Sequence, residues 1–305
     1  MAELRMEREV VFCERPPFPK NMLLELTNIC NQNCIFCGYS KMQRKKCMAD
    51  KALMFDIMQQ AYENGTREIG FYMMGEPLLN PDVADYVAKA KELGFEYIYL
   101  TTNGVLAKLE IMKKLIDAGL SSIKFSINAG SKDTYMKIHG KDDFESVVEN
   151  VKALAQYIKE KQRHLAVFVS CVKTEYNKHE TALVEEIFGP YVDRVYIYPC
   201  INQGGDMLEL VEKGVVQTAK FVGVSTPPCS MIFNRFHITS EGYLAACCNN
   251  TKEDLVVADL RETSVVDAWY SEPMIRIRKE HLTGNISNGR CYRCVHGKNL
   301  ETSLL

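Results

Sequence analysis

Three cysteines lie close together in the segment CNQNCIFCG, where Cys30, Cys34 and Cys37 form a C-x3-C-x2-C pattern. Thiolates are the ligands that soft metal centres such as zinc and iron–sulfur clusters prefer. Closed structural sites use four protein ligands, whereas catalytic metal sites keep one coordination position open for a substrate or cofactor. A loop that offers three thiolates therefore predicts an open metal centre.

Zinc completed by a distant fourth ligand is the alternative for this loop, with His139 or Cys47 as candidates. A second set of cysteines lies in the C-terminal part, where Cys229, Cys247, Cys291 and Cys294 are separated by 17, 43 and 2 residues. This spacing fits either a zinc ribbon or a second iron–sulfur site.

The composition favours metal or redox chemistry over disulfides. The chain has 12 cysteines in 305 residues, and its first ten residues, MAELRMEREV, are charged rather than apolar. No segment approaches the roughly 18 consecutive apolar residues of a membrane span. We therefore expect a cytoplasmic protein with reduced thiols. The formal net charge of −2 predicts neither a nucleic-acid nor a membrane partner.

Apolar segments of strand length alternate with longer segments of helical periodicity through the first 200 residues. Helix C-caps are expected at Gly65, Gly94 and Gly119. Such alternation predicts a parallel sheet with right-handed crossovers. Six repeats fall short of a closed eight-stranded barrel, so the expected fold is α/β, a partial (β/α)6 barrel. The expected strands are 22–27, 68–74, 97–102, 122–127, 165–172 and 194–199.

Short segments of polar, glycine or cysteine residues follow each of the first four expected strands directly. The cysteine segment follows the first strand, and GEP (75–77), TNG (102–104) and NAG (128–130) follow the next three. The carboxyl ends of parallel barrel strands meet on one face, which is where such folds place their active sites. We therefore expect these loops to form one site.

The alternation fails after about residue 200, so we expect a barrel over 1–220 and a small iron–sulfur module over 221–305. The module contains a hairpin-like run, NRFHITSEGYLAACC, and a helix that begins with Ser264 and Asp267 in a capping-box pattern. Trp269, the single tryptophan, is expected to be a core anchor under that helix.

The segment CNQNCIFC, preceded by a strand and followed by MGEP, resembles the radical S-adenosylmethionine (SAM) superfamily, whose signature is C-x3-C-x-aromatic-C with Phe36 as the aromatic. The resemblance implies that Cys30, Cys34 and Cys37 hold a 4Fe-4S cluster whose fourth iron is chelated by SAM. MGEP matches the family's GGEP loop, with Met74 replacing the first glycine. The residues that the resemblance implies for SAM binding are Phe36, Gly75, Glu76, Asn103, Ser126 and Asn128.

The C-terminal pattern resembles the SPASM/twitch auxiliary-cluster module, in which the second ligand lies five residues after a hairpin glycine, as Cys247 follows Gly242. The resemblance implies a second 4Fe-4S cluster held by Cys229, Cys247, Cys291 and Cys294, with Cys248 as a spare thiol. A cluster with four protein ligands has no open position for substrate, so its expected role is electron transfer.

This architecture is similar to the radical SAM dehydrogenases that oxidise a secondary alcohol of 2-deoxy-scyllo-inosamine. The resemblance implies an oxidoreductase that cleaves SAM to a 5′-deoxyadenosyl radical, abstracts hydrogen from a sugar or cyclitol, and passes an electron to the auxiliary cluster. Its partners would be a small sugar-like substrate and an electron donor such as flavodoxin or ferredoxin. Because Cys30 lies near the start, no leader-binding domain is expected, which favours a small substrate.

Two other functions remain open. One is a radical SAM peptide maturase that forms thioethers, oxidises or epimerises, and the other is a non-enzymatic zinc or iron–sulfur binding protein. No proton acceptor is assigned, although Arg194, Tyr198, Arg235 and His237 are expected near the mouth or the module junction. The histidines His139, His237 and His296 are expected to be structural.

Overall fold

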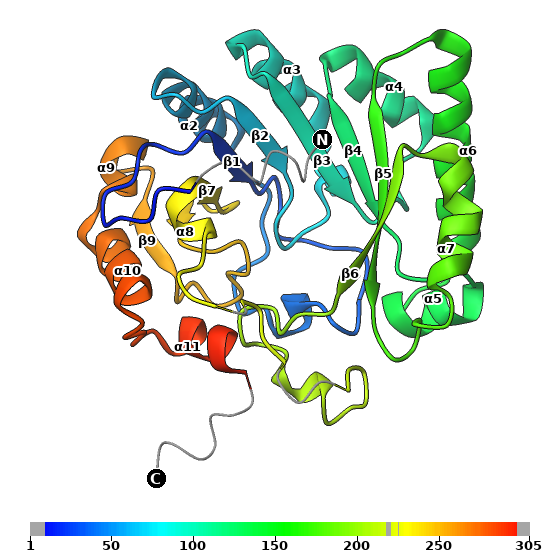
Figure 1. The fold of residues 1–305 in the computed structure, drawn as a ribbon. Coiled ribbons are helices and arrows are strands. Elements are labelled where there is room, and N and C mark those ends of the chain that lie inside the picture. The colour runs from blue at the N-terminus through cyan, green and yellow to red at the C-terminus, as the bar shows by residue number, and fades with distance from the viewer. Residues whose placement is uncertain (1–9, 218–220, 225, 298–305) are drawn as a thin grey trace.

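The computed structural model describes residues 10–217, 221–224 and 226–297. Within these residues the strands form one nine-stranded sheet in the order β6-β5-β4-β3-β2-β1-β7-β8-β9. The sheet curves around the centre of the molecule, and helices α2, α3, α4, α6 and α7 cover its outer face (Figure 1). This is the predicted α/β partial barrel with a C-terminal module.

The six barrel strands are parallel and pair in chain order. β3 and β6 have the predicted bounds, whereas β1 and β2 end three residues earlier than predicted, where the chain turns into the cysteine and MGEP loops. The barrel strands are β1 (Asn21–Leu24), β2 (Glu68–Phe71), β3 (Tyr97–Thr102), β4 (Ser122–Ser126), β5 (Ala166–Lys173) and β6 (Arg194–Pro199).

Some barrel helices begin or end at signals that the sequence carries, although the C-cap of α2 is Asn64 and the expected Gly65 follows it. Asp50 caps α2 by accepting a hydrogen bond from the Leu53 amide, and Gly94 and Gly119 end α3 and α4 in the left-handed conformation. The helices are α2 (Lys51–Glu63), α3 (Val83–Leu93), α4 (Leu109–Ala118), α5 (Lys132–His139), α6 (Phe144–Lys161) and α7 (Thr181–Phe188), with 3-10 turns η1 (Gly38–Lys41), η2 (Pro77–Leu79), η3 (Gly189–Tyr191) and η4 (Leu208–Leu210).

The C-terminal part adds strands to the barrel sheet. β7 pairs in parallel with β1, and β7, β8 and β9 pair antiparallel. The expected hairpin is therefore present, but it extends the barrel rather than standing apart, and the expected boundary at residue 220 falls on 218–220, outside the described residues. The elements are α8 (Met231–Asn234), β7 (Arg235–Ile238), β8 (Tyr243–Ala245), β9 (Val256–Asp259), α9 (Val265–Trp269), α10 (Glu272–Thr283) and α11 (Gly289–His296).

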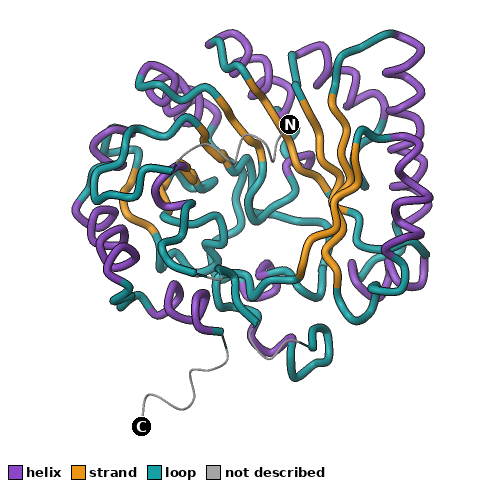
Figure 2. The backbone as a smooth tube through the Cα atoms, in the orientation of Figure 1, coloured by secondary structure: helices purple, strands orange, loops and turns teal. Residues whose placement is uncertain are grey.

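One continuous apolar core lies between the sheet and its helices and extends under the module. Ser264 caps α9 through the Asp267 amide at 3.1 Å, and the fully buried Trp269 packs against Phe18 and Phe236. Loops gather between the barrel strand ends and the C-terminal helices (Figure 2). These loops carry the candidate site.

Candidate active site

The cysteine loop folds back on itself directly after β1. The Cys37 amide donates to the Cys34 carbonyl at 3.0 Å, and the Tyr39 amide donates to Cys37 Sγ at 3.4 Å. The Tyr39 hydroxyl accepts a hydrogen bond from the Cys30 amide at 3.1 Å. The loop therefore presents its three cysteines from a backbone that is fixed by its own hydrogen bonds.

The three thiols lie close enough to affect one another. Burial raises the pKa of Cys30 to about 11 and that of Cys34 well above its usual value, and the neighbouring thiols push both pKa values further upward. Within the described residues, no three His, Cys, Asp or Glu side chains converge on a single-ion site. Three half-buried thiols in one loop suit an iron–sulfur cluster, whose positive charge would stabilise the thiolates.

The MGEP loop approaches the segment after β1 too closely for a side chain at Gly75. A Cβ atom there would lie 2.1 Å from the Thr27 carbonyl oxygen and 2.8 Å from that of Ile29. The next residue, Glu76, donates its amide to the Ile29 carbonyl at 2.8 Å. The loop is thereby fixed beside the residue that precedes Cys30.

The Glu76 carboxylate joins this loop to the one after β3. It accepts hydrogen bonds from the Thr102 hydroxyl and the Asn103 amide, both at 2.7 Å, and from the Leu78 amide at 3.1 Å. Burial raises the pKa of Glu76 to about 7, and these hydrogen bonds partly oppose the shift. Both oxygens therefore bind protein donors, so the side chain orders the strand-end loops.

The other residues assigned to SAM lie at the same strand ends. Asn103 donates its amide group to Asn31 in the cysteine loop at 2.6 Å, and Ser126 is half-buried at the end of β4. Asn128 is buried, and its side-chain oxygen accepts the Val172 amide at 2.7 Å. Phe36 packs in a small apolar cluster with Ile138 and Leu210. Their contacts with SAM stay a prediction.

The four C-terminal cysteines are also brought together. Charge on Cys247 raises the pKa of Cys229, Cys291 and Cys294, after the larger effect of burial. The pKa of Cys247 itself is lowered to about 7, chiefly by a hydrogen bond from Cys248. These mutual effects indicate that the four thiols lie near one another, with Cys248 beside Cys247, and their role as ligands stays a prediction.

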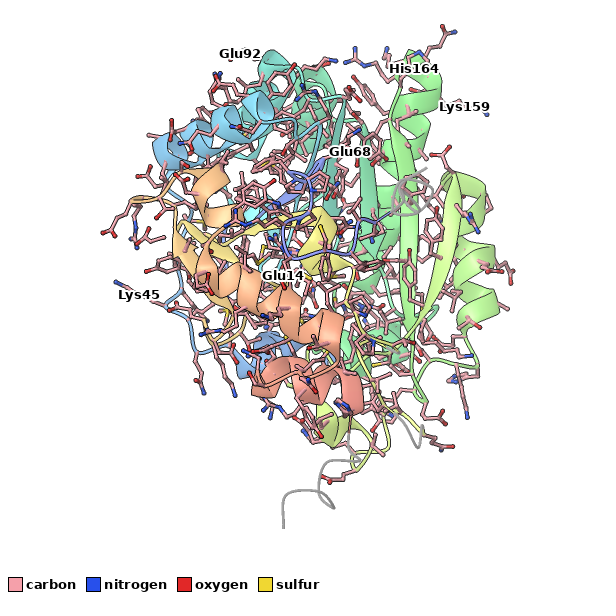
Figure 3. All side chains as sticks on the ribbon, turned by 60° about the vertical axis from the view of Figure 1, so that its left-hand side comes forward. Glu14, Lys45, Glu68, Glu92, Lys159 and His164 are labelled. Atoms are coloured by element: carbon pink, nitrogen blue, oxygen red, sulfur yellow. The ribbon has the colours of Figure 1, made fainter. Side chains whose placement is uncertain are left out.

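A cavity of about 830 Å³ lies inside the barrel. Tyrosines line much of its wall, and the Tyr72 and Tyr99 rings lie 6.0 Å apart. Lys124 Nζ lies 5.9 Å from the Tyr72 ring centre and 5.7 Å from that of Tyr198. Glu68 lies among the barrel strands, whereas Lys159 and His164 lie at the periphery (Figure 3). The cavity also touches Arg235 and Cys248 from the C-terminal part.

The structure places the histidines and arginines that the sequence singled out in different parts of the molecule. His237 is fully buried in β7, where burial lowers its pKa to about 3, and its structural role stays a prediction. His139 lies against Cys34, at 3.5 Å between Nδ1 and Sγ. Arg194 is the exposed first residue of β6, so it lies at the end opposite the strand-end loops. Cys47 contacts Ser240 in the hairpin turn at 3.4 Å.

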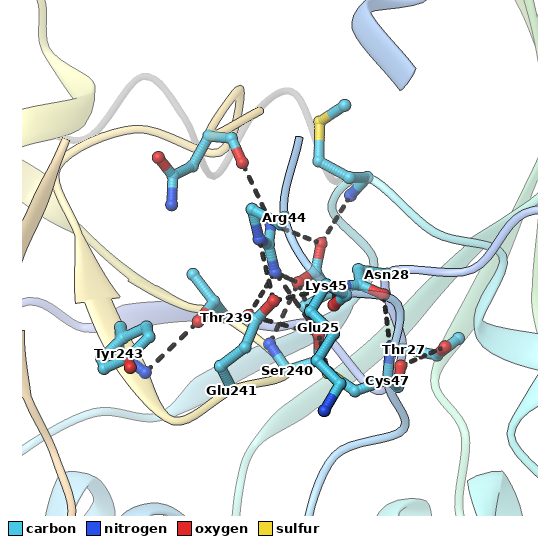
Figure 4. Close-up of polar contacts among 12 residues, drawn as sticks. Glu25, Thr27, Asn28, Arg44, Lys45, Cys47, Thr239, Ser240, Glu241 and Tyr243 are labelled. Atoms are coloured by element: carbon cyan, nitrogen blue, oxygen red, sulfur yellow. Dashed lines mark hydrogen bonds and ion pairs between the residues drawn. The ribbon is translucent and has the colours of Figure 1, made fainter. Parts of the chain in front are cut away.

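Sequence reasoning missed a buried ion network that joins the cysteine segment to the hairpin (Figure 4). Arg44 is buried between Glu25 at the end of β1 and Glu241 in the β7–β8 turn. It also donates to the Asn250 carbonyl at 3.1 Å, while Glu25 accepts the Met74 amide at 3.0 Å. In the sequence, Arg44 stands in the run RKK and is typical of an exposed basic segment, so no local signal marks it.

Comparison with known proteins agrees with this geometry. The Radical SAM superfamily model matches residues 24–183, and a model described as an iron–sulfur cluster-binding domain, SPASM, matches residues 229–295. A Saccharolobus solfataricus protein named probable GTP 3',8-cyclase is 34% identical over 134 residues, which are 44% of this chain and 43% of that protein. The chain thus spans less than half the length of this relative.

Two solved structures share the fold at low sequence identity. BtrN in complex with AdoMet and 2-DOIA has a TM-score of 0.58 and 19% identity, covering 87% of this chain and 88% of its own. Streptococcus suis SuiB bound to its precursor peptide SuiA has a TM-score of 0.69 and 16% identity, covering 91% of this chain and 69% of its own.

Among the described residues, no helix is long and apolar enough to cross a membrane. The family matches indicate that the barrel uses a 4Fe-4S cluster and SAM as cofactors and that the C-terminal part binds an iron–sulfur cluster. Because the first match spans more than half of the chain, the protein belongs to the radical SAM superfamily.

Proposed function

We propose that the protein is a radical SAM dehydrogenase that oxidises a secondary alcohol of a sugar or cyclitol to a ketone. In this proposal Cys30, Cys34 and Cys37 hold the cluster that binds SAM. Cys229, Cys247, Cys291 and Cys294 hold an auxiliary 4Fe-4S cluster. The SAM contacts are assigned to Phe36, Gly75, Glu76, Asn103, Ser126 and Asn128.

The observation that carries the proposal is the barrel cavity, whose wall includes residues close in sequence to the predicted SAM-binding loops and to the predicted auxiliary ligands. Its wall includes Tyr72, two residues before the MGEP loop, and Thr101, which directly precedes the TNG loop. It also includes Cys248, which is adjacent to Cys247. In this proposal a substrate in the cavity would lie close to both the SAM-binding loops and the auxiliary cysteines.

The cavity wall suits a small substrate with several hydroxyl groups. Phenol groups such as those of Tyr72 and Tyr99 both donate and accept hydrogen bonds, and their ring faces can pack against the C–H surface of a sugar ring. Lys124 and Arg235 add cationic donors. Enclosure by the barrel strands would keep water away from a reactive intermediate.

When bound, the cluster with SAM supplies a 5′-deoxyadenosyl radical that takes a hydrogen atom from a carbon. This chain would hold the alcohol carbon near that radical and place the auxiliary cysteines along the same cavity. A ketone then requires loss of one further electron and one proton from the substrate. The proposed electron acceptor is the auxiliary 4Fe-4S cluster that the four C-terminal cysteines would hold, and a flavodoxin or ferredoxin is the proposed source of the first electron.

The test is anaerobic turnover with SAM, a strong reductant and a panel of aminocyclitols and sugars. The proposal expects 5′-deoxyadenosine together with a product two mass units lighter than the alcohol. Parallel reactions with GTP and with a cysteine-containing precursor peptide test the activities named for the protein's relatives. Formation of a cyclised nucleotide or a modified peptide, with no alcohol oxidised, would reject the dehydrogenase.

Two further outcomes would change the assignment. A product of unchanged mass that has gained solvent deuterium would indicate epimerisation instead of oxidation. Anaerobically purified protein that contains zinc, has no visible absorption and leaves SAM intact would favour the non-enzymatic binding protein.

A further inference from the structure

One histidine lies directly against the cysteine loop. His139 is the last residue of α5, is 1% exposed, and has its Nδ1 atom 3.5 Å from Cys34 Sγ. Its ring stacks on Tyr135 with centres 4.0 Å apart and planes within 9°. The imidazole is therefore held in a single position beside the sulfur.

The hydrogen bonds of Asn128 determine which ring nitrogen carries the proton. The Asn128 backbone amide points to His139 Nε2 at 3.3 Å, and an amide N–H can only donate. The Asn128 side-chain oxygen accepts the Val172 amide, so its NH2 group faces Nε2 at 3.2 Å and donates as well. A nitrogen that accepts carries no hydrogen, so the ring is neutral and its hydrogen is on Nδ1.

The hydrogen on Nδ1 then faces the sulfur of Cys34. A donor that faces a cluster sulfur stabilises the reduced cluster more than the oxidised one, because reduction places more negative charge on the sulfur. We propose that His139 donates an Nδ1–H hydrogen bond to Cys34 and raises the reduction potential of the cluster that Cys34 holds. This inference rests on the proposed assignment of Cys34 as a cluster ligand.

The backbone holds this arrangement independently of the imidazole. The Asn33 and Ile35 amides, on either side of Cys34, donate to the His139 and Ile138 carbonyls, both at 2.9 Å. The end of α5 and the cysteine loop are thus joined by main-chain bonds that a side-chain substitution leaves in place. A change at His139 should therefore remove the donor while the loop keeps its path.

The first test compares the wild type with His139→Phe in a potentiometric titration followed by EPR, with and without SAM. The Phe ring keeps the stack on Tyr135 but has no donor, so the potential of the SAM-binding cluster should shift to a more negative value at equal iron content. Tyr135→Phe is the matched control, because the Tyr135 hydroxyl has no hydrogen-bond partner among the described residues. That variant should keep the wild-type potential.

An unchanged potential in fully loaded His139→Phe would overturn the proposal. If that variant fails to load iron, the wild type provides a second test. Protein labelled with 15N-histidine should show a nitrogen hyperfine coupling in pulsed EPR of the reduced signal that SAM shifts. Absence of this coupling would reject the hydrogen bond. Neither readout needs an alcohol substrate, so failure of the dehydrogenase assignment would leave a positive result intact.

Discussion

Replacing Arg44 by leucine tests whether the buried ion network stabilises the junction between the barrel and the C-terminal part. The Arg44 side chain is fully buried, and the carboxylates of Glu25 and Glu241 are 1% and 14% exposed. Leucine retains apolar volume but removes the guanidinium that pairs with both carboxylates (Figure 4). It also leaves the Asn250 carbonyl without the guanidinium donor.

The expected loss follows from what each carboxylate keeps. Removing one partner of a buried ion pair costs about 3–5 kcal/mol. Glu25 still accepts the Met74 and Ser240 amides, both at 3.0 Å, and Glu241 still accepts the Asn28 amide group at 2.8 Å. These donors place the estimate at the lower end, about 3 kcal/mol. At about 2–4 °C per kcal/mol, the Tm should fall by roughly 6–12 °C.

The assay is anaerobic thermal denaturation followed by circular dichroism at matched iron content. Arg163→Leu is the control, because its pair with Asp117 is on the surface, with the side chains 37% and 63% exposed, and should be worth at most about 1 kcal/mol. Adding Glu241→Gln to Arg44→Leu should restore part of the loss, because one unpaired charge is removed. An Arg44→Leu protein that melts with the wild type would refute the reasoning.

Three further perturbations test other parts of the structure. Gly75→Ala should weaken SAM binding at least about tenfold in equilibrium dialysis, because its Cβ would lie 2.1 Å from a backbone oxygen. Gly189→Ala is the control, because a Cβ there meets no atom within 4 Å, and equal SAM affinity of the two variants would contradict the clash. The fold lowers the pKa of His237 from 6.5 to about 3, so below pH 6.5 only the unfolded chain binds a proton at this residue. The free energy of unfolding is therefore unaffected by this residue above pH 6.5 and falls by about 1.4 kcal/mol per pH unit as the pH decreases toward 3. His237→Gln should therefore have a shallower acid limb in urea titrations, and identical limbs would argue against this residue. Cys291→Ser should lower the iron content by about half while dithionite-driven SAM cleavage persists. Cys248→Ser is the control and should keep its iron. Full iron content in Cys291→Ser would remove Cys291 from the ligand set.

Local patterns predicted most barrel elements because each pattern arises within one strand or helix. β3 and β6 match their predicted bounds, and Gly94 and Gly119 cap helices as expected. Helix α5 has no strong sequence signal, because KDTYMKIH carries charges at both ends and only a short apolar stripe. The helix expected from Ser264 ends after five residues, since Ser271 and a proline begin α10.

Some residues of the candidate site were also recognisable from local sequence patterns, whereas others were not. The first cysteine loop and the MGEP loop were recognisable because each is a short segment of specific residue types, and the C-terminal set was recognisable from its C-x2-C pair. The roles of Arg44 and His139 were not, because nothing within a few residues of either marks it as buried beside a carboxylate or a thiol.

The sequence by itself determined the parallel alternation of strands and helices and the thiolate-rich loops at their ends, since these depend on periodicity and spacing over a few residues. Only the tertiary structure decided that β7 joins β1 across about 200 residues of chain, that one arginine is enclosed by two carboxylates, and that an asparagine selects the histidine tautomer facing Cys34. Such contacts depend on how distant segments pack and exclude water, and no local pattern encodes that outcome.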